Sequence, residues 1–210
     1  MSESNQQGTI DALRASNTQH AVNNQDQELI DECLAGQTDA FGRLVVRYQD
    51  RLYNTLVNIM GSPDDARDIA QEAFVHAFRK LATFRGHSAF YSWLFRIALN
   101  AAISQKRKNR RTLVSVEAAR EQAGIEPSDP RSDNHPAHAL ELSERQAIVR
   151  SALGQLSEEY RTVLVLKEMD GLKYEEIAEI VGCPIGTVRS RIHRARTELR
   201  EKLRILLNVE

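Results

Sequence analysis

The sequence predicts an all-α protein: two small helical domains joined by a flexible linker, the C-terminal one containing a helix-turn-helix. Apolar residues recur at three- and four-residue steps through most of the chain, the period of one helix face. No period-2 run of useful length indicates a strand. Three of the five prolines fall between the two helical stretches, and a glycine followed by a proline separates two helical periods near the C-terminus, as in a helix-turn-helix.

The composition is that of an ordinary globular protein, with 210 residues of which 41 % are hydrophobic and 27 % charged. No run approaches the roughly 18 apolar residues of a membrane span, and the first residues lack the pattern of a secretory signal. We therefore expect no direct membrane insertion. Cys33 and Cys183 lie far apart, which argues against a disulfide scaffold or zinc ribbon and favours the reducing cytoplasm, with no metal or cofactor.

Composition divides the chain into four segments. Residues 1–25 are polar and without a sustained apolar period, which predicts a mobile tail. Helical periods over 26–111 and 140–210 predict the two domains, with about 70 to 85 residues each and a modest core. The segment 112–139 holds the clustered prolines and many polar residues, which is typical of a linker.

Helix boundaries in the first domain follow from capping chemistry. A long helix through residues 41–59 should end at Gly61. The next should start at Ser62, whose hydroxyl can accept a free backbone N–H, with Pro63 in the first helical position. We expect its inner face to consist of Ile69, Ala73, Phe74, Ala77, Phe78 and Leu81. A loop and a helix from about residue 89 into a basic run follow, with Trp93 on the core side.

Helices are expected in the second domain at about 140–154, 158–169, 173–181 and 185–206. Tyr174, Ile177, Ala178 and Val181 share one face of the third of these helices. Gly182 suits the left-handed backbone of the turn. Pro184 starts the second helix of the pair, which in a helix-turn-helix enters the major groove.

Charge is segregated although the formal net charge is only −1. Basic residues gather at 105–111 and again at 184–204, while 141–183 is acidic. Two local basic stripes suggest two places that contact phosphate. They also suggest weak DNA affinity for the chain alone, because affinity grows with the number of phosphates neutralised.

Helical angle separates the two sides of the predicted recognition helix. Val188, Ile192, Ala195 and Leu199 should face the core. The candidate DNA-contacting residues of the helix-turn-helix are Thr187, Arg189, Ser190, Arg191, His193 and Arg194. Arg189 and Arg194 could pair with guanine or phosphate, whereas Arg191 and Arg196 are better placed for phosphate. The alternative interpretation is a solvated basic face on a bundle helix.

Three strings resemble a known family: AFGRLVVRYQDRLY, DIAQEAFVHAFRKLATFRGHSAFYSWLFRIALN and EMDGLKYEEIAEIVGCPIGTVRSRIHRAR. They cover roughly 40–105 and 140–205, and they are similar to bacterial extracytoplasmic-function (ECF) sigma factors, sigma-E among them. The resemblance implies a subunit that binds core RNA polymerase, directs it to promoters through −35 and −10 elements, and promotes DNA melting in a stress response. It makes the helix-turn-helix residues named above the candidate −35 readers.

The resemblance also implies site residues in the first domain. The helix over 68–81 resembles the surface that docks on the β′ clamp helices, with Asp68, Gln71, Glu72, His76, Arg79 and Lys80 as its polar side. The loop FRGHSAF and the helix after it resemble the −10 reader, into which a flipped base enters. Its candidate residues are Arg85, Gly86, His87, Ser88, Asn100, Lys106 and Arg107.

The partners that the resemblance implies are core RNA polymerase, through its β′ clamp helices and β flap, promoter DNA and an anti-sigma factor, which often holds such proteins at the inner membrane. Two other classes stay open at this point. A free-standing repressor or activator would explain the second domain but not the FRGHSAF loop. A DNA-acting enzyme such as a recombinase would need a catalytic cluster in 26–111, and no nucleophile–base pair or metal cluster stands out there.

Overall fold

The structure is a computed structural model that describes residues 24–120 and 137–207, with side chains placed in 24–107 and 146–207. Most of the predicted tail and the centre of the predicted linker lie outside the described residues. The side chains of Lys108, Arg110 and Arg111, which complete the first basic run, lie outside them as well.

The first helical region contains a helix over residues 24–34, α2 (Asp39–Met60), α3 (Pro63–Lys80), a 3-10 turn η1 (Leu81–Thr83) and α4 (Phe90–Arg120). The predicted boundary between α2 and α3 is confirmed. Gly61 ends α2 with a left-handed φ of 77°, and Ser62 Oγ accepts the Asp65 N–H at 3.3 Å at the start of α3.

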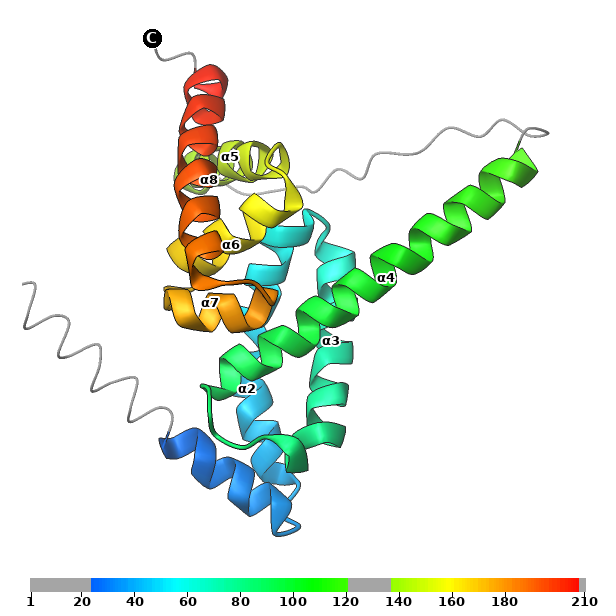
Figure 1. The fold of residues 1–210 in the computed structure, drawn as a ribbon, viewed down its shortest axis with the longest axis vertical. Helices are drawn as coiled ribbons and strands as arrows, with labels where there is room; N and C mark the ends of the chain where they lie inside the picture. Colours follow the sequence, from blue (N-terminus) through cyan, green and yellow to red (C-terminus); the bar gives the residue numbers. More distant parts are fainter. Residues whose placement is uncertain (1–23, 121–136, 208–210) are drawn as a thin grey trace, which may run out of the picture.

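Helix α4 runs further than the sequence predicts and continues to Arg120, past the expected start of the linker at residue 112. Residues 112–120 contain neither glycine nor proline, so no residue in them interrupts the helical backbone. Figure 1 shows this part of α4 extending well away from the other helices.

The second helical region consists of α5 (Ala137–Gly154), α6 (Glu158–Glu168), α7 (Tyr174–Val181) and α8 (Ile185–Leu206). All four predicted helices are present, with boundaries shifted by three residues at most. Two of these helices begin at residues that favour helix initiation. Ser157 Oγ accepts the Tyr160 N–H at 3.4 Å at the start of α6, and α8 begins directly after Pro184. Helices are the regular secondary structure of the described residues, which contain no strand, and this confirms the predicted fold class.

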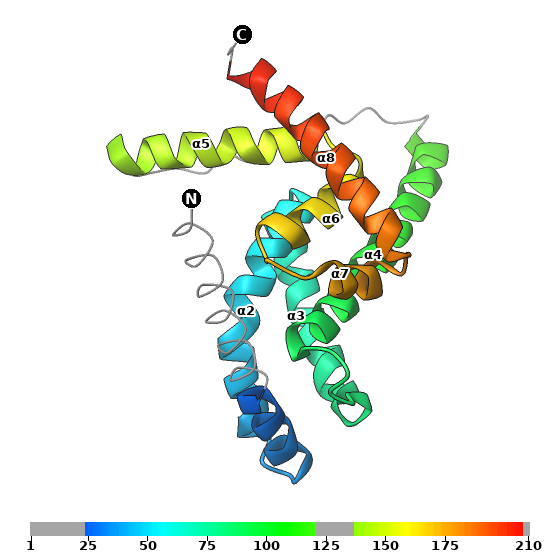
Figure 2. The same ribbon diagram turned by 60° about the vertical axis from the view of Figure 1, so that its left-hand side comes forward.

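Buried apolar side chains form one continuous cluster through both helical regions. Helices α6 and α7 lie against α2 and α4, as Figures 1 and 2 show from two directions. Most of the predicted inner face of α3 is buried, but Phe78 is 44 % exposed, so its expected position was wrong. Its ring packs edge-on against Phe41, with centroids 5.1 Å apart, while its other side faces solvent.

The helix over 24–34 is fixed to α2 by a buried carboxylate. Asp26 is 2 % exposed and accepts hydrogen bonds from Tyr48 Oη and from the Arg47 guanidinium. Burial, followed by the bond to Asp26, raises the pKa of the Tyr48 phenol, so the phenol stays protonated as the donor. Residues 24 and 25, which the sequence assigns to the tail, belong to this helix.

In the described part of the chain, no helix has the length and apolar character that crossing a membrane requires.

Two glycine substitutions should change stability in opposite directions. Gly182 has φ 67° and Gly42 lies inside α2, and a Cβ would have open space at both. We expect Gly182→Ala to lower the free energy of unfolding by about 1 to 2 kcal/mol, because an L side chain is strained in the left-handed region. Gly42→Ala should raise it by about 0.5 to 1 kcal/mol. Urea denaturation measures both, and destabilisation by Gly42→Ala as large as that by Gly182→Ala would contradict this assignment.

Candidate nucleic-acid interface

Helices α7 and α8 form the predicted helix-turn-helix. The turn is closed by the N–H groups of Gly182 and Cys183, which both donate to the Ala178 carbonyl, at 2.9 and 3.2 Å. Val188, Ile192 and Ala195 are buried, as the helical angle predicts, so the orientation of α8 is fixed. On α7 the sequence missed Ile180, which is buried together with Ile177.

The candidate −35 readers differ in their surroundings. Arg189, Ser190, His193 and Arg194 are exposed, and Thr187 and Arg191 are half-buried. Arg191 is paired with Glu159 at 2.6 Å, and Arg189 lies over the Tyr174 ring, 5.6 Å from its centroid. The exposed members lie on the face opposite the buried Val188 and Ile192, where a groove of DNA could be contacted.

Arg196, at the flank of the exposed face of α8, is held by an acidic neighbour. Arg196 donates twice to Glu168 Oε1, at 2.9 and 2.6 Å, and these bonds with the charge of Glu168 raise the pKa of Arg196. Together with the Arg191–Glu159 pair, this places a carboxylate beside each arginine that the sequence assigns to phosphate. DNA would have to compete with these exposed pairs, which are individually weak.

The candidate −10 loop lies between η1 and α4. Arg85, Gly86 and His87 are exposed and Ser88 is half-buried. Gly86 has φ 68°, and a Cβ there would lie 3.3 Å from Gln27 Oε1, so both backbone and space favour glycine. The loop thus passes close to the helix over 24–34 at this point.

Helix α4 carries the remaining candidates. Asn100, Lys106 and Arg107 are exposed on it. Trp93 is 8 % exposed and packs against Phe84 and Phe90, with centroids 5.3 and 5.8 Å away, which confirms its predicted core position. Lys106 contacts Glu158, at the start of α6 in the other helical region.

The polar face of α3 is open to a partner. Asp68, Gln71, Glu72, Arg79 and Lys80 are exposed, and His76 is half-buried. Val75 and Phe78 add apolar area to this helix, with exposed fractions of 43 % and 44 %. Sequence reasoning assigned only polar residues to this surface. Exposed apolar groups bordered by charges are typical of protein-binding surfaces.

Comparison with known families gives two matches in chain order. Residues 44–112 match the family described as Sigma-70 region 2, and residues 146–199 match Sigma-70, region 4. RNA polymerase sigma-H factor of Pseudomonas aeruginosa is 41 % identical over 87 % of this chain and 96 % of that protein. ECF RNA polymerase sigma-E factor of Escherichia coli is 40 % identical over the same fractions.

The chain belongs to the ECF sigma factors of RNA polymerase. Solved structures of sigma factors have the same fold. Bartonella quintana RpoE, in complex with the anti-sigma factor NepR, has a TM-score of 0.62 at 28 % identity and covers 81 % of this chain and 98 % of its own. CnrH, in complex with the cytosolic domain of CnrY, has a TM-score of 0.62 at 29 % identity, with coverages of 85 % and 97 %.

Membership of this family gives the sigma factor a role in promoter recognition by RNA polymerase, as a transcription initiation factor and not an enzyme. Within the described residues no group of His, Cys, Asp and Glu could hold a metal ion. Helix α7 and residues 185–199 of α8 lie in the region 4 match, and the FRGHSAF loop lies in the region 2 match.

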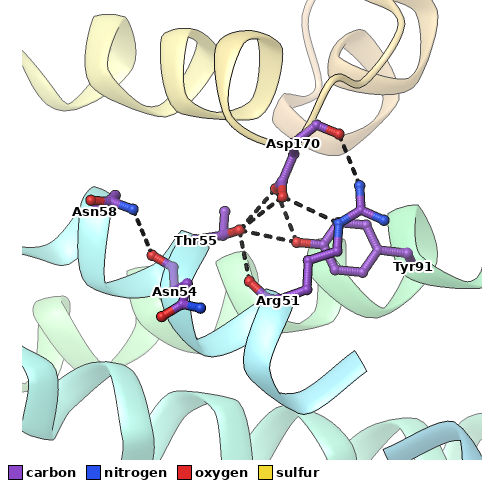
Figure 3. A network of polar contacts seen from close by, with 6 residues as sticks. All are labelled: Arg51, Asn54, Thr55, Asn58, Tyr91 and Asp170. Carbon is purple, nitrogen blue, oxygen red and sulfur yellow. Dashed lines mark hydrogen bonds and ion pairs between the residues drawn. The ribbon is translucent and has the colours of Figure 1, made fainter. Parts of the chain in front are cut away.

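A polar network joins the two regions of the sigma factor, and the sequence did not predict it. Asp170, in the turn between α6 and α7, points into the first region (Figure 3). Its carboxylate accepts from Arg51 Nε at 3.3 Å, Thr55 Oγ1 at 3.0 Å and Tyr91 Oη at 2.9 Å. Arg51 Nη2 also donates to the Asp170 carbonyl at 2.9 Å.

Burial and charge fix the protonation of the donors in this network. Burial, then the charge of Asp170, raises the pKa of Tyr91, so its phenol remains a donor. The Arg51 guanidinium lies over the Tyr91 ring, 3.8 Å from its centroid. Arg51 and Asp170 are 119 residues apart in the sequence, and therefore no periodicity or local motif could have paired them.

Proposed function

We propose that this ECF sigma factor reads the −35 element with the exposed face of α8 and the −10 element with the FRGHSAF loop and the adjoining face of α4. One observation carries the proposal. The two surfaces with the exposed cationic and amide groups that DNA reading requires lie in the parts of the chain that match regions 4 and 2. Arg189 and Arg194 would contact base edges, with Thr187, Ser190 and His193 beside them, and Arg191 would contact phosphate.

Melting of the start site is assigned to the first region. Flipping a base out of the duplex costs a few kcal/mol, because its stacking and pairing are lost. We propose that Gly86 lets the base approach the backbone closely, while Ser88 and Asn100 return hydrogen bonds. Arg85, His87, Lys106 and Arg107 are then placed to contact the phosphates around it.

Core RNA polymerase is the proposed partner of α3. Its exposed face combines Asp68, Glu72 and Arg79 with the apolar Val75 and Phe78, which suits a protein surface such as the β′ clamp helices. Gln71, His76 and Lys80 extend the polar part of this face. The second helical region would contact the β flap, so that polymerase binds both regions at once.

An anti-sigma factor is the proposed inhibitor. The sigma factors RpoE and CnrH, of the same fold, have been solved with NepR and with the cytosolic domain of CnrY. We propose that a comparable protein holds this sigma factor inactive, anchored at the inner membrane, and releases it under stress. The sigma factor itself would act in the cytoplasm, where the chromosome and the polymerase lie.

Run-off transcription with core polymerase and a promoter library tests the proposed function. The sigma factor should bind promoter DNA poorly alone and direct initiation at a defined class of promoters when core enzyme is added. Tight, sequence-specific binding without polymerase, together with transcription no better than that of core enzyme alone, would favour a free-standing repressor or activator instead.

Arg194→Ala tests reading of the −35 element. Loss of a bidentate base contact should reduce discrimination between the cognate and a mutated −35 sequence by about 1 to 3 kcal/mol. Arg200→Ala is the matched control, since Arg200 is an exposed arginine further along α8. Promoter competition assays measure both, and equal discrimination by Arg194→Ala and the wild type would exclude Arg194 as a base reader.

Asn100→Ala tests the melting step. The variant should form the initial complex with duplex promoter normally but yield less open complex, because the flipped base loses a hydrogen-bonding partner. Permanganate footprinting of the start site measures the open fraction. Ser104→Ala is the control, one turn along the exposed face of α4. An unchanged footprint for Asn100→Ala would contradict its assignment to the pocket.

A further inference from the structure

Two arginines flank the exposed face of α8 on opposite sides. At about 100° per residue, Arg191 lies about 100° to one side of Ser190 and Arg196 about 120° to the other. Ser190 is exposed while Val188 and Ile192 are buried, so Ser190 lies near the centre of the face that would enter the groove. The major groove is about 12 Å wide, and a helix with its side chains is about 10 to 12 Å across. The two flanks would therefore face the phosphates of two different strands.

Each flanking arginine is held by a carboxylate of α6, which packs against α8. Glu159, in the first turn of α6, pairs with Arg191 Nη2 at 2.6 Å. Glu168, the last residue of α6, accepts from Arg196 Nε at 2.9 Å and from Arg196 Nη2 at 2.6 Å. Both pairs lie within the second helical region, so they do not depend on how that region lies against the first.

The pair with Glu168 leaves a second edge of the Arg196 guanidinium free. A guanidinium has five N–H donors in a planar fork, and Glu168 takes one from Nε and one from Nη2 on the same edge. The other three donors remain, and no second acid in the described part of the chain pairs with Arg196. A phosphate can bind the edge formed by Nη1 and Nη2 with two parallel bonds. DNA competes with Glu168 for the charge of Arg196, but it does not need the same N–H groups.

Arg191 is held from two sides. Besides the pair with Glu159, its Nη1 donates to Cys183 Sγ, 3.7 Å away in the turn of the helix-turn-helix. The Arg191 side chain is 24 % exposed, and that of Arg196 is 48 % exposed. Both guanidinium groups thus have a defined direction before DNA is present, and Arg196 is the more accessible of the two.

The stability of α6 does not explain Glu168. The C-terminal end of a helix carries a partial negative charge, so an acid is unfavourable in the last turn. Glu168 ends α6, and its side chain is 47 % exposed. Arg196 is its ion-pair partner among the described residues. The contact with α8 is therefore the feature that accounts for a carboxylate at this position.

Preorganisation gives these pairs a role in binding. A free surface arginine samples many rotamers, and a phosphate contact has to restrict them. A carboxylate that already holds the side chain removes part of this cost before DNA arrives. We propose that the two carboxylates of α6 are positioning residues for DNA binding, which hold the flanking arginines of α8 toward the two phosphate strands. Glu168 acts through Arg196 and Glu159 through Arg191, and the inference rests on the proposed function of α8 as the −35 reader.

Loss of Glu168 separates positioning from simple charge by the sign of its effect. Removing an acid near DNA should strengthen binding if charge alone matters. If Glu168 positions Arg196, Glu168→Ala should weaken promoter binding by the complete polymerase with its sigma factor about two- to fivefold, the range of an exposed ion pair. Glu168→Gln removes the same charge but keeps an acceptor, so it should lose less. Glu179→Ala is the matched control, an exposed acid of α7 without an ion pair among the described residues, and it should not weaken binding.

The salt dependence of promoter binding shows whether a phosphate contact is lost. The slope of log affinity against log salt concentration falls by about 1 for each phosphate contact removed. Arg196→Ala should show this fall, and Glu168→Ala should show part of it. In the Arg196→Ala background, Glu168→Ala should cause no further weakening. The same comparison of Glu159→Ala with Arg191→Ala tests the other flank, and filter binding of a promoter fragment by the complete polymerase measures all of them.

Nuclear magnetic resonance of the free full-length chain measures the pair without DNA. The Arg196 Nε–H should exchange with water more slowly in the wild type than in Glu168→Ala, and circular dichroism checks that each variant is folded. Equal exchange in the two proteins, or promoter binding by Glu168→Ala at least as tight as by the wild type, would overturn the positioning role while the proposed function stood. If the wild-type complex selected no promoter, the proposed function would fail and the positioning role with it.

Discussion

A buried carboxylate must be neutralised and hydrogen-bonded, and this constraint fixes how the two halves of the sigma factor lie together. Asp170 reaches this state only against Arg51, Thr55 and Tyr91, which come from two different helices of the other half. Asp170 lies in the turn that joins the end of α6 to the start of α7. Fixing its carboxylate therefore also positions the helix-turn-helix against α4. The arrangement in Figures 1 and 2 follows from that one contact and the apolar cluster beside it.

Pairing of charges divides the basic residues of the sigma factor into two groups. Arg51, Arg191 and Arg196 lie against carboxylates of their own chain. Arg189 and Arg194 are exposed on the outer face of α8. The net charge of −1 is the sum over all 28 basic and 29 acidic residues, so a nearly neutral chain can still present a local cationic surface. The acidic residues therefore hold some of the basic side chains in place, in addition to offsetting their charge.

Local features of the candidate site were predictable, and contacts over long sequence distances were not. The exposed face of α8 followed from the helical angle of Val188 and Ile192, and the core position of Trp93 from its spacing. The apolar part of the α3 surface was missed because Phe78 has the spacing of a core residue, yet only one side of its ring finds a partner, in Phe41. Asp170 stood in a recognised string, but its burial depended on residues more than 75 positions away.

The sequence by itself determined the helices, their caps and their inner faces, because hydrophobic period, Ser62 with Pro63, and the glycines at 61 and 182 act within a few residues of themselves. The sequence also indicated the family, because the matching strings are long enough to be specific. Only the tertiary structure decided which face of each half would be covered by the other. That choice rests on hydrogen bonds between residues up to 119 positions apart. Their energies depend on three-dimensional geometry and leave no period in the chain.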